Sequence, residues 1–399
     1  MSLSEGRPYL AIPGPSVMPD RVLQAMHCGA PNIYAGEIVT MTESIAKDLK
    51  RVAGTEHHVA MYIANGHGVW EAALRNILSP GDTVLVPSVG QFGKGWANMA
   101  RSIGVTVDYM DFPHLQPMDM DQIKAKLQAD TDHKIKAVLV THVDTSSSIK
   151  TDPRVLRGIL DDCGHPALLG VDCIASMGCD RFEMDAMGVD MAISASQKGL
   201  MVPPGVGFVF FNDRAAAVRA TVEAVSEYWD WTPRATPDAY YKYFNGTAPT
   251  HHLFGLREAL DMIFEEGLEA NWRRHEILAR AIWAAVEVWG SEGPMQLNVR
   301  DQTNRSHAVT SAHLGAPAAV DLRNWLEQKA GVTLGIGLGM STQEDPKGEG
   351  FFRFGHMGHM NAHMVLGMLG TVEAAMIALN IPHGKGALSA AAQVVAEGA

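Results

Sequence analysis

Short runs of apolar, β-branched residues recur through the first half of the chain and predict the strands of one sheet. Several runs are continuously apolar, as in KAVLVTH (136–142) and VGFVFF (206–211). Strands buried on both faces of a parallel sheet have this character, whereas half-exposed strands alternate apolar with polar residues. The predicted strands are 58–64, 82–87, 104–110, 136–142, 167–172, 190–196 and 206–211.

Helical patterns lie between these runs, for example GVWEAALRNIL (68–78) and DQIKAKLQA (121–129), where apolar residues recur at helical spacing. Strands that alternate with helices indicate an α/β domain, with helices packed on both faces of a mainly parallel sheet.

The rest of the chain is patterned differently. Aromatic, proline and polar residues crowd segment 225–250, which predicts a functional loop rather than a linker. A long helical pattern at 253–290 follows, with a break expected at Gly267, and a smaller α/β region comes after it. The last dozen residues are rich in Ala and Gly and are expected to fray. We therefore expect an N-terminal arm (1–20), a large domain (21–270) and a small C-terminal domain (271–399).

Composition excludes several classes of protein. With 47% hydrophobic and 19% charged residues in 399, the chain is globular and long enough to bury large cores. Its net charge of −12 argues against binding to nucleic acid or to anionic membranes. There is no CxxC pair among the four cysteines, no secretory signal and no apolar run long enough to span a membrane. We expect a soluble, cytoplasmic protein.

Chemically informative residues directly follow three of the predicted strands, where ligands bind on open parallel sheets. Small residues in Asn65–Gly68 precede a helix, and a helix N-terminus of this kind binds phosphate. Asp172 ends one strand, and Lys198 follows another in an apolar, Gly- and Pro-rich setting. Desolvation makes such a lysine nucleophilic. Each feature also has an ordinary structural explanation, but together they match the needs of pyridoxal 5'-phosphate: a phosphate site, a carboxylate for the pyridine nitrogen and a Schiff-base lysine.

Six motifs resemble those of class V aminotransferases, which have the fold-type I architecture of pyridoxal-phosphate enzymes. The resemblance runs in order from about residue 9 to 380, and its nearest branch is the alanine–glyoxylate, serine–glyoxylate and serine–pyruvate aminotransferases. The motifs are PGPSVMP (13–19), GHGVWEAAL (66–74), THVDTSSS (141–148), VDCIAS (171–176), SQKGLMVPPG (196–205) and RFGHMG (353–358).

The resemblance implies roles for the residues around the cofactor. Lys198 would form the Schiff base and move the Cα proton, and Asp172 would pair with the pyridine nitrogen. Gly66 and His67 would lie at the phosphate, with Gln197 beside it.

It also implies contacts at the ring, the substrate and a second subunit. Phe92 falls where the family stacks an aromatic residue on the ring, and Thr145 where a Ser or Thr approaches the cofactor. Arg353 would bind the substrate carboxylate with two charge-assisted hydrogen bonds. Thr247 matches a phosphate-binding Thr from the partner subunit, which implies a homodimer with shared sites.

Several departures from the family pattern lie near the substrate. Asp144 stands where Glu is common, and Phe244 stands where relatives have a partner-facing Tyr, with Tyr243 one position away. The resemblance implies transfer of an amino group from a small amino acid, alanine or serine, to glyoxylate or pyruvate. Pyridoxamine–pyruvate, aspartate–glyoxylate and phosphonate-specific transamination remain alternatives.

Three other classes compete with this interpretation. His356, His359 and His363 are spaced as zinc or iron ligands on one helical face, and a metal-dependent hydrolase could use them. Gly355 and Gly358 interrupt any such helix, so we expect a turn after Arg353 and no metal site. A non-catalytic binding protein would have no need of a Schiff-base lysine. Cysteine desulfurase chemistry is disfavoured because every cysteine lies at or before residue 179.

Overall fold

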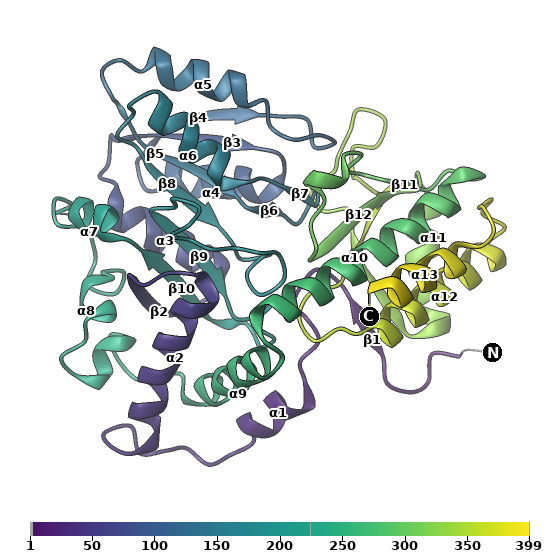
Figure 1. The fold of residues 1–399 in the computed structure, drawn as a ribbon, viewed down its shortest axis with the longest axis horizontal. Helices are drawn as coiled ribbons and strands as arrows, with labels where there is room; N and C mark the ends of the chain where they lie inside the picture. Colours follow the sequence, from purple (N-terminus) through teal and green to yellow (C-terminus); the bar gives the residue numbers. More distant parts are fainter. Residues whose placement is uncertain (1–2, 224, 399) are drawn as a thin grey trace.

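The computed structural model describes residues 3–223 and 225–398, and within them seven strands form one central sheet (Figure 1). The strand order is β2-β10-β9-β8-β5-β3-β4, and β10 alone runs antiparallel to its neighbours. Each of these strands overlaps one of the runs predicted from the apolar pattern. Their bounds are β2 His58–Ala64, β3 Thr83–Ser88, β4 Thr106–Asp111, β5 Ile135–Thr141, β8 Leu168–Asp172, β9 Met191–Ala195 and β10 Gly205–Phe211.

Helices cover both faces of this sheet, as the continuously apolar strands require. On one face, α3 and α4 bury Trp70 and Trp96 against β9 and β3. On the other face, α2, α6 and α9 contribute Ile45, Leu156 and Leu253 to a second core. The helices of this part of the chain are α1 Asp20–Met26, α2 Glu37–Ala53, α3 Gly66–Ile77, α4 Gln91–Ser102, α5 Met120–Ala129, α6 Pro153–Asp162, α7 Asp213–Arg219, α8 Thr232–Ala235, the 3₁₀ turn η1 Tyr240–Tyr243 and α9 Thr250–Glu266.

Among the described residues, a second sheet of five strands has the order β1-β13-β14-β12-β11 and a core of its own. Its strand β1 comes from the predicted N-terminal arm and pairs in parallel with β13. The N-terminal segment is therefore part of a sheet whose other strands come from the C-terminal third of the chain (Figure 1). The strands are β1 Tyr9–Ala11, β11 Gln296–Leu297, β12 Val309–His313, β13 Val332–Ile336 and β14 Phe351–Gly355, and a small separate hairpin joins β6 Val143–Asp144 to β7 Ile149–Lys150.

The helices near the second sheet confirm one expectation and correct another. Gly267, at φ 88°, separates α9 from α10 as predicted, because this left-handed conformation suits glycine. The expectation of a frayed C-terminus is wrong: α13 is a helix that buries Ala387 and Ala391 in the core of the five-stranded sheet, where small side chains let it pack closely against α10. The elements are α10 Leu268–Ser291, η2 Gln302–Asn304, α11 Ala318–Trp325, the π-helical turn η3 Leu326–Ala330, α12 Ala362–Ala378 and α13 Ala387–Gly398.

No helix in the described part of the chain is both long and apolar enough to cross a bilayer.

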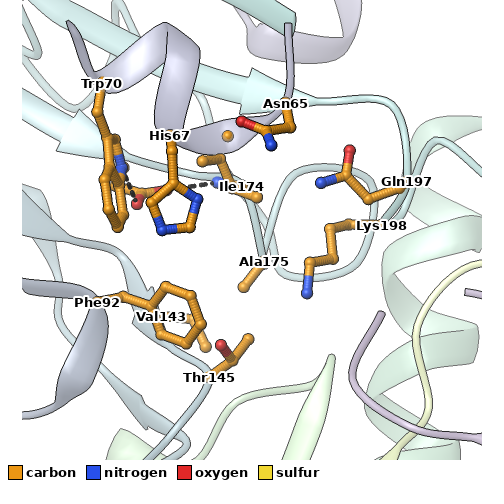
Figure 2. Close-up of a pocket in the computed structure, with 12 residues that line it drawn as sticks. Asn65, His67, Trp70, Phe92, Val143, Thr145, Ile174, Ala175, Gln197 and Lys198 are labelled. Atoms are coloured by element: carbon orange, nitrogen blue, oxygen red, sulfur yellow. Dashed lines mark hydrogen bonds between the residues drawn. The ribbon is translucent and has the colours of Figure 1, made fainter. Parts of the chain in front are cut away.

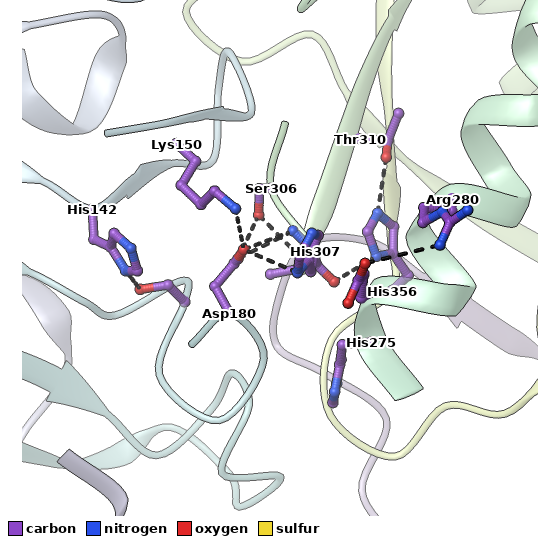
Figure 3. Close-up of polar contacts among 12 residues, drawn as sticks. His142, Lys150, Asp180, His275, Arg280, Ser306, His307, Thr310 and His356 are labelled. Atoms are coloured by element: carbon purple, nitrogen blue, oxygen red, sulfur yellow. Dashed lines mark hydrogen bonds and ion pairs between the residues drawn. The ribbon is translucent and has the colours of Figure 1, made fainter. Parts of the chain in front are cut away.

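A buried carboxylate joins the two parts of the chain (Figure 3). Asp180, which is fully buried after β8, accepts hydrogen bonds from Ser306 Oγ at 2.9 Å and from the His307 backbone N–H at 3.0 Å, just before β12. Lys150 Nζ lies 3.5 Å from the same carboxylate. Burial by itself would raise the pKa of Asp180, but the charge of Lys150, with smaller contributions from His307 and His142, outweighs it and lowers the pKa to about 2. Asp180 therefore stays ionised and holds β12 against the first part of the chain.

We predict that Asp180→Asn lowers the free energy of unfolding by about 3 kcal/mol, because it leaves Lys150 without its buried counter-charge. A carboxylate whose pKa is depressed stabilises the fold above its unfolded pKa. The difference in unfolding free energy between variant and parent should therefore be largest at neutral pH and should shrink as the pH falls from about 4 towards about 2. Urea unfolding at several pH values measures this difference. Asp238→Asn, which removes an exposed partner of Lys242, is the control and should change stability little. Equal effects of the two substitutions would contradict the role given to Asp180.

Candidate active site

A cavity of about 150 Å³ opens at the carboxyl ends of β2, β5, β8 and β9, where an open parallel sheet places its ligand site (Figure 2). Both the strand-to-helix turns and the loop after β9 contribute to its walls. The described residues that line it are Asn65, Gly66, His67, Trp70, Phe92, Val143, Thr145, Asp172, Ile174, Ala175, Gln197 and Lys198.

The N-terminus of α3 forms one wall. The Asn65 side chain caps the helix by accepting a hydrogen bond from the Gly68 N–H at 3.2 Å. A Cβ at Gly66 would lie 2.7 Å from Ile174 Cδ1, so the start of the helix lies close to the loop after β8. The first N–H groups of a helix have no partner within it, and those of Gly66 and His67 lie at the cavity. This wall can bind an anionic group.

Asp172 lies at the base of the cavity, at the end of β8, and is only 4% exposed. Its Oδ1 accepts a hydrogen bond from the Ile174 N–H at 2.8 Å, and its Oδ2 accepts one from Trp70 Nε1 at 2.8 Å. Burial raises the pKa of Asp172 to about 6, although these two hydrogen bonds act in the opposite direction. The carboxylate is thus ionised at neutral pH and suited to pair with a cationic ring nitrogen.

Lys198 enters the cavity from the loop after β9 (Figure 2). Burial, with a smaller contribution from the charge of Arg353, lowers the pKa of its amine to about 8. The N-terminal segment holds this loop: Ser16 Oγ donates to the Lys198 carbonyl at 2.7 Å, and Lys198 Nζ donates to the carbonyl of Pro13. A side chain at Gly14 would collide with the lysine. The amine is therefore held in place and easily deprotonated, which are the requirements for a nucleophile.

Arg353, on β14 of the second sheet, bonds to a residue that lines the cavity and is 6% exposed. Its Nε donates to the Ile336 carbonyl at 2.7 Å, and Nη1 donates to the carbonyl of Thr145, which lines the cavity, at 2.9 Å. Nη2 has no hydrogen-bond partner among the described residues. Burial lowers the pKa of Arg353 to about 10, while Asp144 acts in the opposite direction, so the guanidinium stays charged near neutral pH.

Asp144, which departs from the family pattern, holds the helix that carries Phe92. Helix α4 begins without a side-chain cap of its own. Asp144 Oδ2 takes that place by accepting hydrogen bonds from the backbone N–H groups of Phe92 at 2.9 Å and Gly93 at 3.1 Å. A carboxylate at a helix N-terminus is favourable. It fixes the turn from which the Phe92 ring projects into the cavity (Figure 2).

The structure brings most of the predicted site residues to one cavity. Those that line it are Gly66, His67, Phe92, Thr145, Asp172, Gln197 and Lys198. Arg353 reaches it through Thr145, whereas Thr247 is exposed and lies away from the cavity of its own chain. Trp70 was not predicted as a site residue. Its place in the motif, one helical turn after His67, was a signal for it, because residues three apart share a helix face.

These residues fit pyridoxal 5'-phosphate. The buried Gln197 Oε1 has no hydrogen-bond partner among the described residues, and the other end of this amide points into the cavity (Figure 2). The unpaired N–H groups of α3 suit the phosphate, Asp172 suits the ring nitrogen and the Lys198 amine suits the aldehyde.

The three histidines considered as metal ligands are separated. Both ring nitrogens of His356 are engaged, by Thr310 Oγ1 at 2.9 Å and by the His307 carbonyl at 3.0 Å (Figure 3). His363 lies in the first turn of α12 and, with His359, lines a different groove. Nowhere in the described chain do three His, Cys, Asp or Glu side chains form a group that could hold a metal ion.

Comparison with known proteins agrees with this geometry. Residues 9–361 match the family described as aminotransferase class V. The chain is 34% identical over 381 residues to serine–glyoxylate aminotransferase of Methylorubrum extorquens, covering 93% of this chain and 92% of that protein. It is 33% identical over 387 residues to L-aspartate–glyoxylate aminotransferase of Paracoccus denitrificans, covering 96% of this chain and 94% of that protein. The crystal structure of pyridoxamine–pyruvate aminotransferase from Mesorhizobium loti has the same fold over the full length of both chains, with a TM-score of 0.88 at 23% identity. This chain belongs to the class V aminotransferases and is a pyridoxal-phosphate-dependent transaminase of fold type I.

Proposed function

We propose that this enzyme transfers the amino group of a small L-amino acid, alanine or serine, to glyoxylate or pyruvate in two half-reactions. One observation carries the proposal: a desolvated Lys198 amine and the Asp172 carboxylate face one cavity, and the Arg353 guanidinium bonds to a residue that lines it. Two relatives that are about one third identical are both named for glyoxylate, which supports this acceptor.

When bound, pyridoxal 5'-phosphate condenses with amines and withdraws electrons from the carbon that bears the amine. Lys198 would move the proton in each half-reaction: its Nζ would take the proton from Cα of the amino acid for the neighbouring cofactor carbon in the first, and return a proton to Cα of the new amino acid in the second. Its lowered pKa suits this task, because a proton shuttle works best when its pKa lies near the operating pH.

The other residues would bind and orient the cofactor and the substrate. Asp172 would hold the proton on the ring nitrogen, and the N-terminus of α3, with Gln197 beside it, would bind the phosphate. Phe92 and Thr145, which line the same cavity, would contact the ring. Arg353 binds the carboxylate shared by every α-amino and α-keto acid, and its two bonds to backbone carbonyls keep the guanidinium in a fixed orientation.

We further propose a homodimer in which Thr247 reaches the phosphate of the neighbouring subunit. Thr247 is exposed at the end of a loop that is pinned from behind by the buried Arg234, which donates to the carbonyls of Met61 and Tyr243. Phe244 is 1% exposed and belongs to the core, so Tyr243, which is half-buried, is the residue available to a neighbour. All four cysteines are free thiols, which supports a place in the cytoplasm.

The visible absorption spectrum of the purified enzyme tests the proposed reaction. We expect a yellow cofactor band that L-alanine or L-serine bleaches and that glyoxylate or pyruvate restores, because each half-reaction changes the cofactor between its aldehyde and amine forms. Bleaching by L-aspartate or by pyridoxamine alone would instead assign one of the alternative transaminations. The control is Lys198→Ala, which should lose turnover while keeping its fold; near-parental turnover by this variant would overturn the role of Lys198.

Arg353→Ala should raise KM for alanine by about 10- to 100-fold, which is what losing a charge-assisted hydrogen bond costs. Bleaching by ethylamine, which has no carboxylate, should change much less, and this comparison separates lost binding from general damage. Arg353→Lys keeps the charge but not the two-pronged geometry, and should lie between parent and Ala variant. An unchanged KM for every α-amino acid would rule out this role for Arg353.

The rate at which cofactor-free enzyme reacts with pyridoxal 5'-phosphate should rise with pH and level off above about 8, the pKa of Lys198. Below that pKa the amine is protonated and non-nucleophilic, so the rate should fall about tenfold for each unit of pH. Stopped-flow absorbance measures the rate, and N-acetyl-lysine serves as the solvent-exposed reference. A rate that continues to rise up to the ordinary lysine pKa would contradict the effect of burial.

A further inference from the structure

Trp70 is a buried tryptophan of α3 that no part of the proposed reaction uses. It is 2% exposed, and its indole Nε1–H donates to Asp172 Oδ2 at 2.8 Å (Figure 2). Asp172 has two carboxylate oxygens, and the first, Oδ1, is already held by the Ile174 N–H. Trp70 is therefore the side-chain donor that fixes the second oxygen.

The indole ring also packs against both aromatic residues at the cavity. The rings of His67 and Trp70 meet edge to face with centroids 4.5 Å apart, and those of Phe92 and Trp70 do so at 6.3 Å. Behind it, the ring of Trp96 is stacked at 6.5 Å. These three neighbouring rings hold the indole in one orientation, in which its N–H points at Asp172.

We propose that Trp70 is a positioning residue for Asp172: its N–H orients Oδ2 and makes the carboxylate a weaker base, so that the cofactor's ring nitrogen keeps its proton. The inference rests on the role proposed above for Asp172. A carboxylate with fewer donors holds a proton more tightly. Without the indole N–H, Asp172 would compete with the ring nitrogen for the proton they share.

The other titratable groups around Asp172 do not supply this hydrogen bond. Lys198, on the loop after β9, favours the ionised form of Asp172 through its charge, and Asp144, on β6, disfavours it. His67 lines the same cavity, and Cys173, the next residue, is buried with a raised pKa. Of the side chains around Asp172 in the described structure, Trp70 makes the direct hydrogen bond.

Trp96 offers a matched control. It is fully buried in the same aromatic cluster and the same core, but its Nε1 has no hydrogen-bond partner among the described residues. Trp70→Phe and Trp96→Phe thus remove similar volumes from one cluster, and only the first removes a hydrogen bond to Asp172.

The test is the dissociation constant of pyridoxal 5'-phosphate, measured by absorbance across the acid range in the full-length protein. Binding should weaken as Asp172 becomes protonated near pH 6. In Trp70→Phe this weakening should begin about one pH unit higher, while Trp96→Phe should leave its position unchanged. The phosphate of the cofactor titrates in every variant alike, so a displacement between variants reports Asp172. Equal profiles for the two variants would reduce Trp70 to a packing role and overturn the inference.

Asp172→Asn separates this inference from the proposed function. Asparagine does not titrate, so the weakening of cofactor binding that Asp172 causes near pH 6 should be absent from this variant. A pH profile like that of the parent would refute the role of Asp172 itself. If Asp172→Asn loses this weakening while the two Phe variants behave alike, only the inference about Trp70 fails.

A measurement on the unmutated chain covers the case in which Trp70→Phe does not fold. With ¹⁵N-labelled tryptophan, one of the eight indole N–H resonances should shift with a midpoint near pH 6 as Asp172 titrates. If none titrates in that range, no indole N–H is bonded to Asp172 and the inference is wrong.

Discussion

The site depends on two charged groups being buried close together at the ends of neighbouring strands. Strands β8 and β9 pair in parallel, so Asp172 and the loop that carries Lys198 emerge at the same edge of the sheet. Burial acts on both groups: it raises the pKa of Asp172 to about 6 and lowers that of Lys198 to about 8. At neutral pH this leaves a carboxylate suited to pair with a cationic ring nitrogen and an amine whose pKa lies within about one unit of the operating pH, which suits the proton transfer proposed for Lys198.

The second sheet completes this site. Arg353 on β14 bonds to the carbonyl of Thr145, and the segment after β1 holds the lysine loop through Ser16. In the proposed reaction, the substrate carboxylate bound by Arg353 would be tied to one sheet, while the lysine that acts on its Cα belongs to the other. The relative position of the two sheets sets the distance between these groups. Buried contacts such as those of Asp180 with Ser306 and His307 thus contribute to the geometry of catalysis as well as to stability.

Much of the fold and part of the site followed from local patterns in the sequence. Continuously apolar runs identify strands buried on both faces, and residues that directly follow such strands, Asp172 and Lys198 among them, lie at one edge by topology alone. What could not be predicted depends on contacts between distant segments. The capping of α4 by Asp144 and the hydrogen bond from Trp70 to Asp172 have no signature in the spacing of residues. Helix α13 likewise forms because its alanines pack on α10. The Ala- and Gly-rich composition of this segment suggested fraying, because composition does not show such a contact.

Three buried aspartates show how surroundings divide one residue type among different tasks. Asp144 is fully occupied by the N–H groups of α4 and by Ser146, and Asp180 by Ser306, His307 and Lys150. The nearby cation keeps the pKa of Asp180 at about 2, whereas Asp172, without a hydrogen-bonded cation, has a pKa of about 6. The two neutral donors of Asp172, Trp70 Nε1–H and the Ile174 N–H, orient the carboxylate without neutralising its charge. The remaining attraction for a cation suits the role proposed for Asp172, which is to bind a protonated ring nitrogen.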